Sequence, residues 1–112
     1  MGSSLDPAAL DRLRHAVDDV DERIVALLAE RFRLTERIAE LKDPDAPVAD
    51  KARSLDVLDR VETAAAAHGL PAGIAGPVWS VLIALSIGHQ SACIARRRGP
   101  AASRPRASGP DQ

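Results

Sequence analysis

The sequence has very few aromatic side chains and only one cysteine. Phe32 and Trp79 are the only aromatic residues among 112, so Ala, Leu, Val and Ile must build most of any core. Such a composition suits packed helices better than a sheet. Cys93 has no second cysteine to pair with, which excludes an intrachain disulfide and fits a reducing compartment. We therefore expect a helical protein located in the cytoplasm.

The signals of several functional classes are also missing. We find no basic-then-apolar leader and no apolar run long enough to span a bilayer, and we expect no membrane partner. There is no Gly-rich phosphate loop, no Ser-His-Asp set and no paired-carboxylate set. The histidines, His15, His68 and His89, show no metal-ligand spacing, so we expect no metal site.

The net charge of −1 conceals an uneven distribution. Residues 96–112 hold five of the 15 Lys and Arg residues but only one of the 16 Asp and Glu residues. This segment is rich in Pro, Gly, Ser and Ala and has no periodicity, which predicts a disordered tail after a domain over 1–95. A weak nucleic-acid arm is the alternative. Because no aromatic residues lie between the arginines, we expect no nucleic-acid partner.

Three helices account for the rest of the chain, which predicts an all-α fold. The first is expected over 5–42, between an Asp6-Pro7 start and the Pro-rich segment 43–47. The second is expected over 51–68, with Asp50 as its N-cap and Gly69 after its end. The third should begin at Pro71 or Pro77 and end near Arg96, and its apolar middle indicates a buried helix.

The length of the first helix predicts an intertwined homodimer. About 37 residues at 1.5 Å per residue make a rod of roughly 55 Å. A compact chain of this size has a diameter of only roughly 34 Å. Apolar residues nevertheless continue along the whole rod at steps of three and four, which favours cover by a second copy. These residues are Leu10, Leu13, Val17, Val20, Ile24, Leu27, Leu34, Ile38 and Leu41.

A charged residue interrupts this apolar pattern at Arg31. It could reach the surface or pair with Glu30 or Glu36, or it could point into a pocket and hold an anion. Arg14 and Lys42 return to nearly the same helix face at 100° per residue. Arg31 and Lys42 are close enough to grip one small ligand, whereas Arg14 can reach that ligand only from the partner chain.

The expected third helix carries two neutral polar residues on an apolar face. Ser86 and Gln90 are i,i+4 neighbours, with Ile83 and Ile87 beside them. Such a wall suits a buried polar ligand, although Gln90 could also lie where the helix reaches solvent. For other polar residues we favour plain roles: a surface position for Arg53, a boundary position for His89 and packing for Cys93.

Together these residues resemble the all-helical, type II chorismate mutases over about residues 8–95. Any one motif would be weak, but five polar residues must fall in register on three helices. The segments that carry the resemblance are Leu13-Arg14 with Asp18 and Asp21, Leu27 to Arg31, Ile38 to Lys42, Pro47 to Asp50 with Arg53, and Ser86 to Gln90.

The resemblance implies a homodimer with two identical shared sites and no cofactor, which converts chorismate to prephenate. By position, Arg14 of the partner chain, Arg31 and Arg53 would bind the two carboxylates of this small dianion. Lys42 and Gln90 would hydrogen-bond the ether oxygen, and Asp50 and Ser86 would assist. The side chains of Ile38, Ile83 and Ile87 would form apolar walls.

One position departs from the family pattern. Ser54 stands where these mutases usually have a Glu that contacts the ring hydroxyl, although Ser54 can also hydrogen-bond a hydroxyl. Isochorismate pyruvate lyases and 4-amino-4-deoxychorismate mutases also lack this Glu, so both remain alternatives to a chorismate mutase. A third alternative is a non-catalytic helical dimer that binds an anion or a protein.

Overall fold

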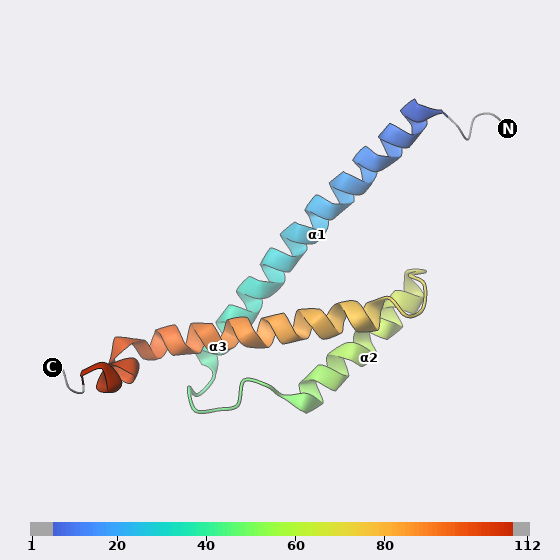
Figure 1. Ribbon diagram of the computed structural model, residues 1–112. Coiled ribbons are helices and arrows are strands. Elements are labelled where there is room, and N and C mark those ends of the chain that lie inside the picture. Colours follow the sequence, from blue (N-terminus) through green and yellow to red (C-terminus); the bar gives the residue numbers. More distant parts are fainter. Residues whose placement is uncertain (1–5, 109–112) are drawn as a thin grey trace. The chain divides into compact units, whose positions relative to one another are not determined.

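The computed structural model describes the backbone of residues 6–108 and the side chains of residues 6–99. It contains three helices: α1 over Pro7–Leu41, α2 over Lys51–Ala67 and α3 over Ala75–Ser108 (Figure 1). No strand occurs within the described backbone. The prediction of an all-helical chain with one very long first helix is therefore confirmed.

The caps of α1 and α2 follow directly from local sequence. Oδ1 of Asp6 accepts a hydrogen bond from the Ala8 amide at 3.0 Å, and Pro7 occupies the first helical position. Asp50 is the N-cap of α2, and its Oδ1 accepts from the Arg53 amide at 3.0 Å. Both carboxylates satisfy amides that have no partner within their helix.

The end of α2 is a glycine-dependent turn. The Leu70 amide donates to the Ala65 carbonyl at 2.9 Å, and the Gly69 amide donates to the Ala66 carbonyl at 3.3 Å. This pair of bonds defines a Schellman motif, in which the residue after the cap adopts a left-handed backbone. Gly69 has a φ of 75°, so its lack of a β-carbon explains the predicted stop.

The chain divides into two compact units, and the first comprises the residues up to Leu34. Its described part is a stretch of α1 whose large apolar side chains remain exposed. Leu13 is 65% exposed, Val17 57% and Leu27 63%. The apolar stripe seen in the sequence therefore has no cover within this unit.

The second unit begins at Thr35 and contains the last turns of α1 with α2 and α3. Here α2 packs against α3, and the buried apolar residues are small or medium in size. The core of the unit consists of Ala39, Val57, Ala65, Ala75, Leu82 and Ile94. Such a small core holds the helix pair together and leaves α3 residues such as Val81 and Leu85 exposed.

The third helix differs from the prediction at both of its ends. It begins at Ala75, between the two predicted starts, and Pro77 lies in its first turn. It also continues past Arg96 to Ser108, interrupted at Gly99, where φ is 76° and ψ is −174°. Arg96, Arg97 and Arg98 therefore belong to a helix rather than to a tail without structure. Residues 109–112 of the expected tail lie outside the described residues.

One sequence-based expectation about membranes needs correction. The stretch Ala75–Gly99 of α3 is long and apolar enough to cross a bilayer, with a mean hydropathy of 1.5 in its best window. No Asp, Glu, Lys or Arg occurs in this stretch before Arg96. Length and composition alone are weak support for a membrane span, because core helices of soluble proteins pass the same test.

Candidate active site

The residues expected to form the apolar wall of the third helix all lie on α3. Ser86 is buried at 4% exposure, and Ile83 and Ile87 on either side are partly buried. One turn further along, Oε1 of Gln90 is buried and accepts no hydrogen bond from the described residues. A buried acceptor without a donor costs about 1–3 kcal/mol. Such an acceptor calls for a hydrogen-bond donor, which water or a ligand can supply.

Lys42 lies directly after the last residue of α1. Its ammonium faces the carbonyls of Pro47 and Val48 at 3.5 and 3.4 Å, both in the loop that leads to α2. Among residues 6–99, no carboxylate forms an ion pair with it and no hydrogen bond joins it to Gln90. The loop thus holds a positive charge that neutral carbonyls only partly compensate.

The first turn of α2 gathers three of the predicted site residues. The carbonyl of Asp50 accepts from the Ser54 amide at 2.9 Å, and the Ser54 side chain is partly buried. Nη1 of Arg53 pairs with Asp56 at 3.1 Å, and Arg60 shares the same carboxylate oxygen at 3.0 Å. Exposed pairs of this kind are worth about 0–1 kcal/mol, so Arg53 can leave Asp56 for a ligand at little cost.

The remaining predicted residues lie on α1. Arg14 is exposed and Arg31 is partly buried, and both belong to the first unit. Arg31 interacts with other groups of the chain, so its side chain is already engaged. Ile38 belongs to the second unit and is about half exposed. The structure describes each unit by itself, so the predicted grip of Arg31 and Lys42 stays a prediction.

Sequence reasoning missed two arginines that hold the end of α1. Arg97 donates to the carbonyls of Ala39 and Lys42, the second at 3.1 Å. Arg98 donates to the Pro44 carbonyl at 2.8 Å and pairs with Asp45. A guanidinium at a helix C-terminus satisfies carbonyls that lack intrahelical partners. Arg97 and Arg98 therefore anchor the loop that carries Lys42.

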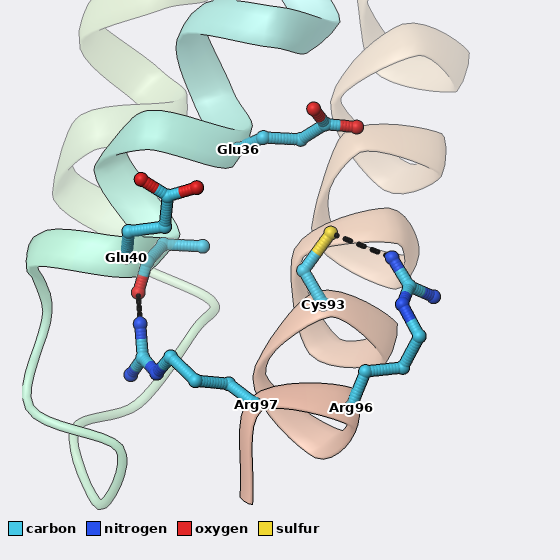
Figure 2. A pocket seen from close by; sticks show the side chains of 6 residues that line it. Glu36, Glu40, Cys93, Arg96 and Arg97 are labelled. Atoms are coloured by element: carbon cyan, nitrogen blue, oxygen red, sulfur yellow. Dashed lines mark hydrogen bonds between the residues drawn. The ribbon is translucent and has the colours of Figure 1, made fainter. Parts of the chain in front are cut away.

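A pocket of about 360 Å³ lies beside this anchor, between the last turns of α1 and the part of α3 that carries Cys93, Arg96 and Arg97 (Figure 2). None of the predicted site residues lines it. Its lining consists of Glu36, Ala39, Glu40, Cys93, Arg96 and Arg97.

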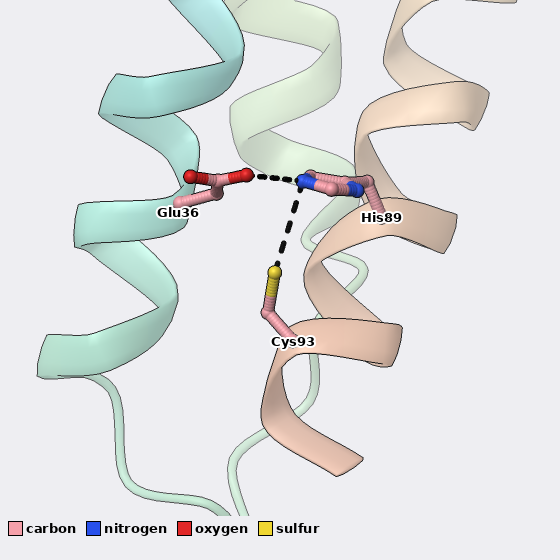
Figure 3. A group of neighbouring side chains, drawn as sticks. All are labelled: Glu36, His89 and Cys93. Carbon is pink, nitrogen blue, oxygen red and sulfur yellow. Dashed lines mark hydrogen bonds and ion pairs between the residues drawn. The ribbon is translucent and has the colours of Figure 1, made fainter. Parts of the chain in front are cut away.

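Three residues near this pocket could hold a metal ion, against the expectation of no metal site. Ligand atoms of Glu36, His89 and Cys93 all lie within 4.8 Å of one another (Figure 3). The sequence offered one signal that was overlooked: His89 and Cys93 are spaced i,i+4, which places both on one helix face.

The second unit therefore contains a loop ammonium, an arginine in the first turn of α2 and a face of α3 with a buried serine and a glutamine, whereas Arg14 and Arg31 belong to the first unit. Ammonium and guanidinium groups beside neutral polar groups are of the kind that suits a small anionic ligand, and the fold that carries them is all-helical. The family profile "Chorismate mutase type II" matches residues 13–91, which is most of the chain. The chain belongs to this family, and its enzymatic class is that of the isomerase chorismate mutase.

A curated relative agrees with this assignment. The chain is 29% identical over 75 residues to a chorismate mutase of Methanocaldococcus jannaschii. The aligned residues cover 66% of this chain and 76% of the relative. No solved structure matches the chain.

Proposed function

We propose that this protein rearranges chorismate to prephenate in sites built around Lys42 and Gln90, and that it does so as a homodimer in the cytoplasm. The observation that carries the site is the buried amide of Gln90, whose Oε1 has no donor among the described residues. Oε1 accepts hydrogen bonds, so a water or a hydroxyl of the substrate would satisfy it, and the Nε2–H group of the same amide is the one that would donate to the ether oxygen.

The reaction explains why these residue types suffice. One C–O bond breaks and one C–C bond forms within the same molecule, so no nucleophile or proton transfer is needed. The enzyme must hold a flexible dianion in a compact conformation, which is a positioning task for Arg14, Arg31 and Arg53. Negative charge grows on the ether oxygen as its bond breaks. The Lys42 ammonium and the Gln90 amide would bind that oxygen more strongly in the transition state than in the ground state.

The exposed apolar stripe of α1 supports a homodimer. Side chains such as Leu13, Val17 and Leu27 are more than half exposed in the single chain. Each large side chain that a partner buried would contribute about 1.5–3 kcal/mol. A second copy carries the same stripe, and an antiparallel arrangement would bring Arg14 of one chain to the site of the other. If the partner chain also covered the exposed apolar side chains of α3, its apolar character would need no bilayer.

Ser54 favours a second candidate function. It occupies the first turn of α2 where the family pattern has an acidic residue, and its side chain is partly buried. A serine places no negative charge near the ring hydroxyl. The same proposed site could then bind isochorismate, which would be cleaved to salicylate and pyruvate. It could also bind the 4-amino analogue of chorismate.

A side-by-side assay tests the proposal. Purified protein is given chorismate, isochorismate and 4-amino-4-deoxychorismate, and prephenate, salicylate and the amino product are measured. We expect chorismate to have the highest kcat/KM. Fluorescent salicylate formed faster than prephenate would instead select the lyase.

Two matched pairs of variants test the assigned residues. Lys42→Ala and Arg31→Ala should each lower kcat/KM by at least about 100-fold, the cost of removing one charge-stabilising donor. Lys51→Ala and Arg33→Ala remove an exposed neighbour of the same charge and should stay within about twofold of the parent. Full activity in Lys42→Ala would refute the assigned site.

A further inference from the structure

We propose that Glu36, His89 and Cys93 form a binding site for Zn²⁺ that joins the end of α1 to α3. The three side chains converge from two helices within the second unit, as Figure 3 shows. Glu36 comes from the penultimate turn of α1, and His89 and Cys93 come from successive turns of α3. Binding at this site is independent of the proposed isomerisation, which needs no metal.

The distances fit a tetrahedral ion with modest rearrangement. Zn–N bonds of about 2.0 Å and Zn–S bonds of about 2.3 Å place nitrogen and sulfur about 3.5 Å apart in a tetrahedron. Nε2 of His89 and Sγ of Cys93 are 3.7 Å apart. Nε2 of His89 is 2.5 Å from Oε2 of Glu36, in direct hydrogen-bond contact. An inserted ion would lengthen this separation to about 3.4 Å, a shift of under 1 Å for a flexible glutamate.

The donor set selects the metal. Imidazole and thiolate together disfavour Mg²⁺ and Ca²⁺, which take oxygen ligands. A mixture of one carboxylate, one imidazole and one thiolate suits Zn²⁺, which accepts all three in four-coordinate sites. Glu36 and His89 are also accessible enough for an ion to enter, with side-chain exposures of 40% and 34%.

The fourth coordination position opens toward the pocket. Glu36 and Cys93 both line this pocket, whose 360 Å³ exceeds the roughly 30 Å³ of a water molecule many times over. We assign this position to water. Nη2 of Arg96 now donates to Sγ of Cys93 at 3.2 Å (Figure 2). Since Arg96 is exposed, its guanidinium can turn into solvent when the sulfur binds the ion.

The test is a metal titration of the full chain, purified without added histidines, reduced and stripped with a chelator. Calorimetry with Zn²⁺ should show one ion bound per chain. Co²⁺ serves as the spectroscopic probe and should give a sulfur-to-cobalt charge-transfer band. Because Cys93 is the only cysteine, that band reports this site alone. Absence of the band, or no saturable Zn²⁺ binding, overturns the proposal.

Ligand variants locate the ion. Cys93→Ser, His89→Gln and Glu36→Gln should each weaken Zn²⁺ binding by at least about 100-fold, because even outer partners of metal ligands are worth about 10- to 100-fold. Zn²⁺ should raise the Tm of the parent and leave that of Cys93→Ser unchanged. Circular dichroism of each metal-free variant checks that it is folded. If a variant fails to fold, the cobalt spectrum of the parent protein still tests the proposal.

Two substitutions serve as matched controls. His68→Gln removes a histidine at the end of α2, and Glu40→Gln removes a carboxylate on the wall of the same pocket. Both should bind Zn²⁺ within about threefold of the parent. Equal losses in these controls and in the ligand variants would show that the ion binds elsewhere, and they would overturn the assignment.

Discussion

Replacing Arg97 by alanine should impair catalysis through Lys42, although Arg97 touches no substrate in the proposed site. Arg97 donates to the carbonyls of Ala39 and Lys42 and so bridges the last turn of α1 and the loop that follows. Arg97→Ala removes both hydrogen bonds at once. Of the two arginines that anchor the Lys42 loop on α3, only Arg98 would then remain.

The structure sets the size of the effect. Hydrogen bonds to charged groups contribute about 1.5–3 kcal/mol, and the exposure of Arg97 reduces that figure. We expect a loss of about 1–2 kcal/mol in the free energy of unfolding. If the Lys42 ammonium contributes about 3–4 kcal/mol to transition-state binding, loss of part of its alignment should lower kcat about tenfold. KM should change less, because the arginines proposed to bind the carboxylates are untouched.

A double-mutant cycle separates this mechanism from general destabilisation. Arg97→Ala and Lys42→Ala are compared singly and together, with kcat measured at a temperature where all variants are folded. If Arg97 acts through Lys42, its removal should cost little once Lys42 is absent. Arg96→Ala is the matched control, because the neighbouring arginine contacts Cys93 rather than the end of α1. A tenfold loss from Arg97→Ala in both backgrounds would refute the positioning role.

Three further predictions concern stability and assembly. Gly69→Ala should destabilise the chain by about 1–2 kcal/mol, because alanine resists the φ of 75°, whereas Gly88→Ala in the open helical position of α3 should stabilise it by up to about 1 kcal/mol. Chemical denaturation measures both, and equal effects would contradict the Schellman assignment. Asp50→Ala should cost about 1 kcal/mol through the lost N-cap, with an unchanged melting curve as the opposing result. Leu27→Asp should yield monomers with little activity in sedimentation and turnover assays, and an active monomer would contradict the shared site.

The small core of the second unit makes these effects measurable. Its buried apolar residues are three side chains of valine or leucine size, Val57, Leu82 and Ile94, and three alanines. A chain of this size has a total stability of only about 5–15 kcal/mol. A single lost cap or anchor is therefore a noticeable share of it. Dimerisation would add stability in proportion to the apolar surface of α1 that it covers.

Local sequence was sufficient for most of the fold. The caps at Asp6 and Asp50 and the stop at Gly69 lie where predicted, because each depends on contacts within a few residues. The apolar spacing along α1 likewise determines a helix with an uncovered stripe. The arrangement of Ser86 and Gln90 followed from the i,i+4 geometry of a single helix.

Only the tertiary structure decided which distant residues meet. Arg97 reaches the end of α1 across 58 and 55 residues of sequence, and His89 reaches Glu36 across 53. No local pattern encodes such contacts, because they depend on how the loops turn and how the helices pack. For this reason the sequence placed Arg97 and Arg98 in a solvated tail, whereas in the structure they hold the loop that carries Lys42. Likewise, the sequence suggested a boundary role for His89 and a packing role for Cys93. In the folded chain both lie beside Glu36, with which they form the proposed metal site.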